Sequence, residues 1–256
     1  MQVVTLWRAP VKSLQGEALP SAVLTGRGIL GDRHWALRDE GSGRFLTARR
    51  EPALLFGRAT ADDDRAVHLH LPDGATRTVH AGNDDERAVA DAALSAWLGR
   101  PVRLVEASDD VAGVFENPLD AEGEQDWVTW QGPTGRFHDS TRTAVSLVTT
   151  GSLRGWDPRR FRANVVLAGG DGEEDALVGR TVRIGSAQLE ITKQIDRCVM
   201  VTRPQPDGLA RDLDVLRTVH RERRSCLAVA ALVTADGHLA IGDGVEVVGA
   251  VDDADR

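Results

Sequence analysis

Short apolar runs, some alternating with polar residues, recur along the 256-residue chain between glycine, proline and aspartate. Runs of this kind predict β-strands rather than long helices. In the first part of the chain, strands are predicted at 3–7, 18–25, 33–38, 54–60, 66–71 and 102–106. Further along, strands are predicted at 144–148, 163–167, 181–184, 187–192, 226–233 and 245–248.

Helical patterns are few. Residues 85–98 begin with acidic side chains, place Val89 and Trp97 on one apolar side, and end at Gly99, which predicts the main helix. A hydroxyl cap near Thr149 predicts a short helix that continues to Trp156. The expected fold is therefore mainly β with a few helices (α+β), and the short strands of the first part indicate a small β-barrel or sandwich.

One segment, 107–140, has no clear period and is rich in glycine and acidic residues, including the run 120–124. Because structureless loops of this length are uncommon inside compact domains, the segment is interpreted as a linker or a lid loop. The expected organisation is an N-terminal domain at 1–106, the connecting segment at 107–140 and a second domain at 141–256.

Composition narrows the function class. Apolar residues make up 41% and charged residues 27% of the chain, as in ordinary globular proteins, and the net charge is -8. An acidic chain argues against a nucleic-acid or membrane-surface binder. The start lacks the pattern of a signal peptide, no run approaches about 18 apolar residues, and two cysteines do not form a disulfide scaffold. We therefore expect a cytoplasmic protein with neither nucleic-acid nor membrane partners.

Cys198 is the most informative residue, because it follows Arg197 at the end of a predicted strand. A cation beside a thiol favours the thiolate, which ligates soft metals or attacks electrophiles. Four segments place a cation or hydroxyl at a strand-to-turn transition, and arginines and hydroxyls bind phosphate. These segments are 12–13, 32–35, 149–152 and 160–164. Each alone is typical of solvated arginines or helix caps; with Cys198, they indicate an anionic cofactor and a thiolate centre.

The chain resembles the MOSC family of molybdenum-cofactor proteins, in the branch that reduces amidoximes and carries a β-barrel domain before the MOSC domain. Residues 10–13 match its PVKS motif, 31–35 its DRxW motif and 46–52 its TARxEP motif. Residues 160–164 read RFRAN where the family has RFRPN, and Arg197-Cys198 follows in the family order. Ala163 replaces the family proline, and Gln194-Ile195 replaces a Pro-Cys pair found in many relatives.

The resemblance implies a role for each matching position. Cys198 would be the protein thiolate on the molybdenum of a molybdopterin cofactor, and hence the catalytic residue. The N-terminal barrel would bind the cofactor phosphate with Lys12, Ser13 and Arg33. The MOSC domain would bind the phosphate and pterin with Thr149, Thr150, Ser152, Arg162, Asn164 and Arg197.

The resemblance also implies an activity. The protein would be an oxidoreductase that reduces N-hydroxylated compounds such as amidoximes and hydroxylamines, by oxygen transfer to molybdenum. Electrons would come from a separate donor of the ferredoxin, flavodoxin or reductase type, and the protein would be a monomer. Two alternatives stay open: a molybdenum-cofactor carrier, and a sulfur transferase that holds a persulfide on Cys198.

Overall fold

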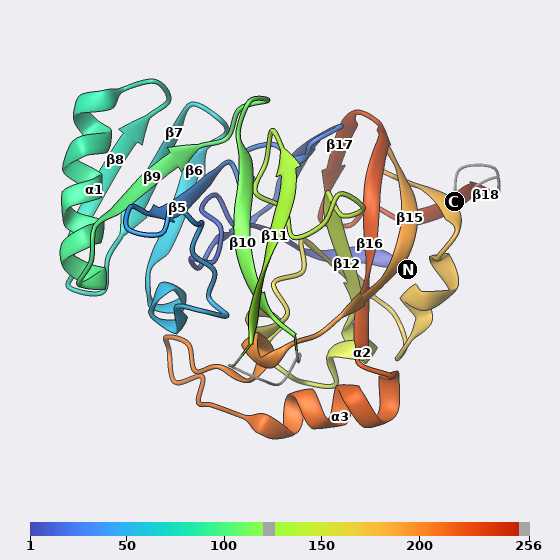
Figure 1. Cartoon of the computed structure of the whole chain (residues 1–256). Helices are drawn as coiled ribbons and strands as arrows, with labels where there is room; N and C mark the ends of the chain where they lie inside the picture. The colour runs from blue at the N-terminus through green and yellow to red at the C-terminus, as the bar shows by residue number, and fades with distance from the viewer. Residues whose placement is uncertain (120–125, 251–256) are drawn as a thin grey trace.

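The computed structural model describes residues 1–119 and 126–250. Strands form most of its regular structure, with three α-helices and four short 3-10 helices among the described residues (Figure 1). The prediction of a mainly β protein with a few helices is confirmed.

An eight-stranded sheet organises the second part of the chain. Its strand order is β18-β14-β15-β16-β12-β13-β1-β2. The strands are β1 (Gln2–Arg8), β2 (Glu17–Leu19), β12 (Val145–Thr149), β13 (Val165–Ala168), β14 (Arg180–Ile184), β15 (Ala187–Asp196), β16 (Cys226–Ala235) and β18 (Val245–Ala250). Two strands from the start of the chain are therefore part of the sheet of the predicted second domain.

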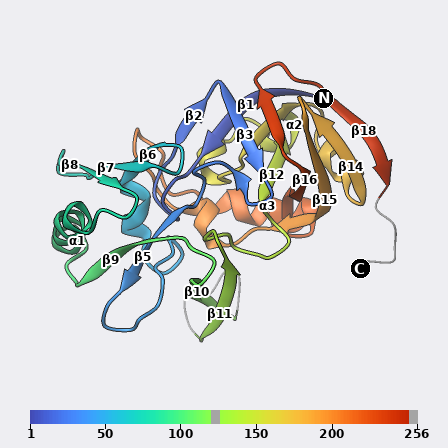
Figure 2. The same ribbon diagram turned by 90° about the horizontal axis from the view of Figure 1, so that it is seen from above.

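This sheet curls, so that the start of β1 lies beside the segment that leads into β18 (Figure 2). Val3 N donates to Asp243 O at 2.9 Å, and Gly242 N donates to Val3 O at 2.8 Å. The enclosed side chains form one apolar cluster that joins Leu6 of β1 to Leu147 of β12 and Leu189 of β15. Burial of this cluster holds the start and end of the chain together.

The N-terminal part contains three smaller sheets. Their orders are β17-β3-β4, β5-β9 and β6-β7-β8. The strands are β3 (Ser21–Thr25), β4 (Gly28–Ile29), β5 (Trp35–Asp39), β6 (Arg58–Asp62), β7 (Ala66–His70), β8 (Thr76–His80), β9 (Val102–Glu106) and β17 (Gly237–Ala240). β17 comes from the end of the chain, and the sheet β17-β3-β4 packs Leu24 and Leu239 into the apolar cluster of the large sheet.

The helix predicted at 85–98 is α1 (Asp84–Leu98), which packs on β8 and β9. The Asn83 side chain accepts a hydrogen bond from Glu86 N and so caps its first turn. Gly99 ends the helix with φ 67°, a left-handed conformation that glycine adopts without strain. Ala90 and Leu94 are its buried residues, whereas Val89, which the sequence pattern places on the apolar side, is exposed.

The predicted strand at 54–60 is partly wrong. The chain there forms the 3-10 helix η1 (Pro52–Phe56), followed by β6. Pro52 lies in the first turn, where its missing N–H costs no hydrogen bond.

Residues 107–140 contain an antiparallel hairpin rather than a structureless linker. β10 (Ala112–Pro118) pairs with β11 (Trp127–Thr134), and Phe115 packs with Phe45 and Phe137 in a separate apolar cluster. The predicted acidic run at 120–124 lies outside the described residues. The lack of a clear period has a physical cause, since most side chains of β11 are partly or fully exposed.

The remaining helices surround one end of the large sheet. They are α2 (Thr150–Leu153), η2 (Pro158–Arg160), η3 (Glu173–Leu177), η4 (Val199–Thr202) and α3 (Leu213–Arg223). Helix α3 packs on η4 through Val215 and Val219, which share an apolar cluster with Val201. Across 1–119 and 126–250, no helix combines the length and the apolar character needed to cross a membrane.

Candidate functional site

A cavity of about 430 Å³ lies between the two parts of the protein. Its lining comes from the turn after β1, the β10-β11 hairpin and the end of β15, among other segments. Lys12, Ser13, Arg33, Arg162, Arg197 and Cys198 all line it. The structure thus brings together six of the ten residues that the sequence predicts for the site.

Three of these residues hold cations close to one another. Burial, with the charge of Arg33 nearby, lowers the pKa of Arg162 to about 10. Burial also lowers the pKa of Lys12, against the opposing effect of Asp139, and Arg33 and Arg162 lower it further. Like charges held together in this way destabilise one another, and an anion bound among them would relieve the repulsion.

The backbone is constrained at the same place. Ser13, Arg33 and Arg162 have φ values of 72°, 49° and 53°, in the left-handed region that non-glycine residues seldom occupy. Local hydrogen bonds hold these conformations: Ser13 Oγ accepts from Ala48 N at 2.9 Å, and Arg33 N donates to Ala9 O at 2.8 Å. Strain of this kind clusters at functional sites, where it directs side chains toward a ligand.

Asn164 lies behind the cavity wall rather than in it. Its Nδ2 donates to Asp32 Oδ2 at 3.2 Å, and its Oδ1 accepts from Ser146 N and Oγ, each at 3.1 Å. Asp32 is fully buried and also pairs with the Arg33 guanidinium. Asn164 therefore orients Arg33 through Asp32, across the boundary between the two parts of the chain.

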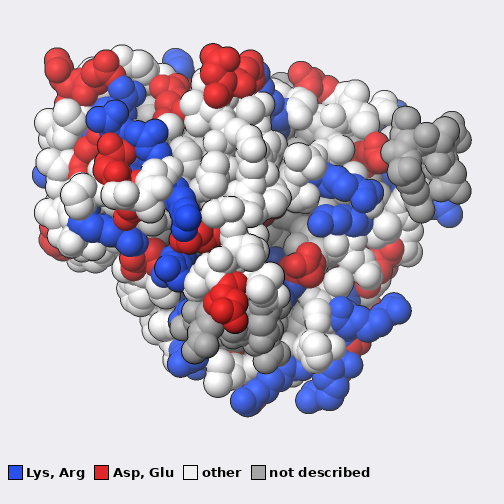
Figure 3. Space-filling view, viewed as in Figure 1, with Lys and Arg blue, Asp and Glu red and all other residues white. Residues whose placement is uncertain are grey.

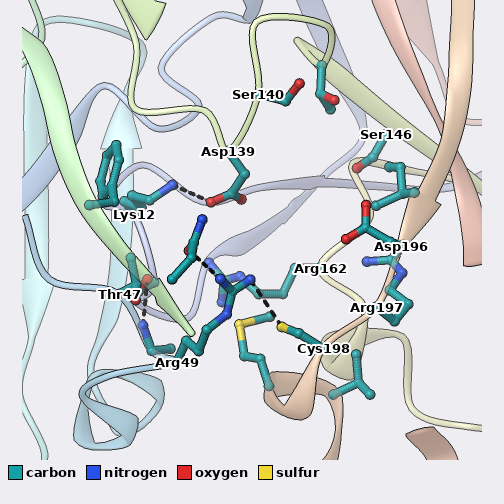
Figure 4. A pocket seen from close by; sticks show the side chains of 18 of the residues that line it. Lys12, Thr47, Arg49, Asp139, Ser140, Ser146, Arg162, Asp196, Arg197 and Cys198 are labelled. Carbon is teal, nitrogen blue, oxygen red and sulfur yellow. Dashed lines mark hydrogen bonds and ion pairs between the residues drawn. The ribbon is translucent and has the colours of Figure 1, made fainter. Parts of the chain in front are cut away.

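Asp139 is a site residue that the sequence analysis missed. Its carboxylate accepts a hydrogen bond from Lys12 Nζ at 2.6 Å (Figure 4). The side chain is 79% exposed, but it lines the cavity and has protein around it. Burial opposes the charged form, yet Lys12 and Arg33 outweigh it and hold the pKa of Asp139 well below its usual range. Asp139 is therefore an anion already present among the cations.

The thiol of Cys198 opens into the same cavity, but Arg197 is not the cation that contacts it. Arg197 Nε donates to Leu227 O at 2.7 Å, and its Nη1 donates to Phe161 O at 3.0 Å. Instead, Arg49 Nη2 donates to Cys198 Sγ at 3.3 Å (Figure 4). The neighbouring Arg197 interacts with Cys198 through its charge, while the hydrogen bond to the sulfur comes from an arginine 149 positions away.

Arg197 nevertheless has a donor to spare. Its Nη2 is buried and has no hydrogen-bond partner in the structure, and the residue lines the cavity. Burial lowers the pKa of Arg197 to about 10, partly offset by Cys198 and Asp196. A buried donor without a partner is costly, and an acceptor on a ligand would satisfy it.

The structure places Thr149, Thr150 and Ser152 in a different cluster. Thr149 Oγ1 donates to Glu174 Oε2 at 2.7 Å, and Ser152 Oγ donates to the same oxygen at 2.8 Å. Thr150 Oγ1 donates to Gly169 O at 3.2 Å. The Thr149 side chain caps α2 by accepting from Ser152 N. These hydroxyls are engaged within the protein and do not line the cavity.

The donor set fits a phosphate-bearing, soft-metal cofactor. The cavity joins crowded cations, a free arginine N–H and a thiol, and a thiolate is a ligand for soft metals. Around it, the β10-β11 hairpin forms a largely uncharged strip on the face shown in Figure 3, with Lys and Arg on both sides. The hairpin side chains that line the cavity include Phe115, Leu119 and Trp130, so that wall is mostly apolar.

Comparisons with known proteins also divide the chain into two successive parts. A family model described as the MOSC N-terminal beta barrel domain matches residues 1–122, and one described as the MOSC domain matches residues 134–246. A curated protein, the molybdenum cofactor sulfurase of Drosophila grimshawi, is 27% identical over 238 residues. That alignment covers 86% of this chain but 30% of the sulfurase, so the chain spans less than a third of that relative.

Two solved structures show low similarity. The YUAD protein of Bacillus subtilis is 11% identical, with a TM-score of 0.43, over 95% of this chain and 93% of that one. YiiM from Geobacillus stearothermophilus is 13% identical, with a TM-score of 0.34, over 55% of this chain and 73% of that one. The two family models together match most of the sequence in the order of barrel, then MOSC domain. The chain belongs to the MOSC-domain family, with the N-terminal beta barrel domain ahead of the MOSC domain.

Proposed function

We propose that this protein is a molybdenum-cofactor-dependent oxidoreductase that reduces N-hydroxylated compounds. One observation supports it above all: the thiol of Cys198 and the cations Lys12, Arg33 and Arg162 open into one cavity between the two parts of the chain. MOSC-domain proteins are linked to sulfuration of the molybdenum cofactor and to reductase activity, which makes this cofactor the expected occupant.

In this proposal each part of the chain binds a different part of the cofactor. Lys12, Ser13, Arg33 and Arg162 bind the phosphate, because they place three cations and a hydroxyl together. The free Nη2 of Arg197 donates to a polar atom of the pterin, and Cys198 Sγ ligates the metal. Asn164 acts indirectly, by orienting Arg33 through Asp32.

When bound, the cofactor supplies two-electron oxygen-transfer chemistry. In the overall reaction the N–O bond of R–NH–OH breaks. Two electrons and two protons are consumed, and R–NH2 and water are the products. Asp139 cannot deliver a proton at neutral pH, because its pKa is held below its usual range and it is ionised. Its part is to hold the Lys12 ammonium in place.

The electrons are assigned to a separate redox protein of the ferredoxin, flavodoxin or reductase type. A [2Fe–2S] cluster takes four protein ligands, typically cysteines, and the two cysteines in this sequence are Cys198 and Cys226. We further propose that the protein acts as a monomer, because both halves of the cavity come from one chain.

The test is molybdenum content per chain, measured by elemental mass spectrometry after expression in a host that makes the cofactor. Wild type should contain close to one molybdenum, Cys198→Ala should lose it or change its coordination, and Cys226→Ala should resemble wild type. Loaded wild type with an artificial electron donor should then reduce benzamidoxime. A metal-free wild type, from a host shown to load another molybdoenzyme, contradicts the proposal. Loaded protein that leaves benzamidoxime unchanged favours the cofactor carrier.

The similarity to a molybdenum cofactor sulfurase supports a second candidate, transfer of sulfur through a persulfide on Cys198. This function needs the thiol and a cavity but no resident metal. Intact mass spectrometry after incubation with a low-molecular-weight persulfide, which can pass its outer sulfur to the thiolate and leave as a thiol, separates the two: a gain of one sulfur on Cys198, without molybdenum, favours the second candidate.

A further inference from the structure

Arg49 belongs to the N-terminal part of the chain and lies beside the thiol of Cys198 in the second part. One arm of its guanidinium, Nη2, donates to Cys198 Sγ at 3.3 Å, and the other arm, Nη1, donates to Asn117 Oδ1 on β10. Its Nε is buried without a partner. A single side chain from the N-terminal part therefore contacts both the thiol and the hairpin that walls the cavity.

The backbone that carries Arg49 is firmly held. Ala48 N donates to Ser13 Oγ, a cavity residue, at 2.9 Å. Glu51 N donates to Thr47 O at 2.8 Å and Arg50 N to the same oxygen at 3.0 Å, which closes a tight turn. Because the turn is bonded to the cavity wall, the guanidinium projects from a fixed point rather than from a free loop.

The hairpin side of the bridge is also held. Glu116, next to Asn117, pairs with Arg44 and lies 3.5 Å from Arg50 Nε. The Arg50 guanidinium stacks over the Trp127 ring, with 4.5 Å to its centroid. Three arginines of one segment thus bind the hairpin, but within the described residues Arg49 alone among them also contacts the sulfur.

We propose that Arg49 is a positioning residue for Cys198, and that Asn117 keeps it in that position. Hydrogen bonds to a sulfur ligand fix its direction and modify its electron donation, and loss of such a contact typically costs about 10- to 100-fold in metal affinity or activity. Because Asn117 belongs to the hairpin, the position of the Arg49 guanidinium depends on the position of the hairpin. The hairpin therefore affects both the wall of the cavity and the orientation of the Cys198 sulfur.

The role in catalysis rests on the proposed function, and the chain provides a matched control. Arg50 is the adjacent arginine and binds the same hairpin, but it has no contact with Cys198. The variants are therefore Arg49→Gln, Arg49→Lys, Asn117→Ala and the control Arg50→Gln, each checked for cooperative unfolding. Lysine can donate to the sulfur, but its single nitrogen does not reproduce the rigid fork that places one guanidinium arm on each acceptor.

On the cofactor-loaded protein, the measurements are molybdenum content, the electron paramagnetic resonance spectrum of the half-reduced metal, and kcat against KM. Arg49→Gln should lower molybdenum content or kcat by about 10- to 100-fold and alter the spectrum. Asn117→Ala and Arg49→Lys should show smaller changes of the same kind, and Arg50→Gln should match wild type. An Arg49→Gln protein with the content, spectrum and kcat of Arg50→Gln overturns the inference and leaves the proposed function intact.

A second readout needs no cofactor. The rate at which iodoacetamide alkylates Cys198 in the cofactor-free chain, followed by mass spectrometry at one pH, should differ from the wild-type rate in Arg49→Gln, because Cys198 Sγ loses the hydrogen bond that Arg49 Nη2 donates. Arg50→Gln should react at the wild-type rate. Equal rates in both variants overturn the contact itself, even if wild type holds no molybdenum and the proposed function fails.

Discussion

Replacing Asp139 with asparagine should change stability and anion binding in opposite directions. The substitution keeps the size of the side chain but removes the negative charge 2.6 Å from Lys12 Nζ. Lys12 is only 4% exposed and lies near Arg33 and Arg162, so its ammonium loses its main counter-charge. The cofactor-free protein should be less stable, while an incoming anion should no longer compete with a carboxylate.

The magnitude follows from the geometry of the pair. Opposite unit charges about 4 Å apart interact by about 4 kcal/mol at an effective dielectric of about 20, and by about 1 kcal/mol in water. Because the Asp139 side chain is 79% exposed to the cavity, solvent screens the pair and the lower range applies. We expect a loss of about 1–2 kcal/mol in the free energy of unfolding. If a bound anion displaces the same interaction, its affinity should rise by about 5- to 30-fold.

Two measurements on the cofactor-free chain at pH 7 test this expectation: denaturant unfolding, and calorimetric titration with inorganic phosphate. The control is Asp109→Asn, which breaks the exposed ion pair with Arg27 and should leave phosphate affinity unchanged. The reasoning fails if Asp139→Asn is as stable as wild type, or if it binds phosphate no more tightly. Tighter binding in the Asp109 control would point to net charge rather than to the site.

Three more predictions concern single side chains. Burial, with Arg33 nearby, lowers the pKa of His138 to about 4. Since the unfolded state binds more protons between about pH 6.5 and 4, the free energy of unfolding should fall by up to about 3 kcal/mol as the pH decreases through that window. His138→Gln should remove this contribution when unfolding is measured against pH. Thr149→Val should lower the free energy of unfolding by about 1–3 kcal/mol, because Glu174 loses a hydrogen bond. Phosphate titration should give the wild-type affinity, and weaker binding would show that Thr149 does take part in anion binding. Lys12→Ala combined with Arg33→Ala should lower molybdenum content well below that of Cys226→Ala, as measured by elemental mass spectrometry, and equal contents would contradict the phosphate site.

Alternation of apolar and polar residues predicts most strands of the fold, because one face of each is buried. Alternation does not reveal β11, because most of its side chains are partly or fully exposed. The helical pattern of α3 was missed for another reason: Val215, Leu216 and Val219 form a narrow apolar stripe in an otherwise polar segment. The cap at Asp212 and the spacing of those three residues could have indicated the helix.

For the site, the short motifs point to Lys12, Ser13, Arg33, Arg162 and Cys198, which meet in the cavity. Sequence alone cannot tell a hydroxyl that caps a helix from one that binds a ligand, and Thr149 shows the difference. Nor can it pair Arg49 with a sulfur 149 residues away, or Asp139 with Lys12, since both contacts depend on the three-dimensional fold.

The contribution of β1 and β2 to the large sheet has a consequence for synthesis of the chain. β1 is made first, yet its neighbour β13 begins at Val165, and the hydrogen bonds that close the curled sheet involve residues 242–245. At about 5–20 residues per second, the first strand leaves the ribosome roughly ten seconds or more before its last partners exist. Contacts so distant along the chain slow folding. β1 can pair with β2 early and with β13 later, but the contacts of residues 2 and 3 that close the sheet must wait until translation is nearly complete.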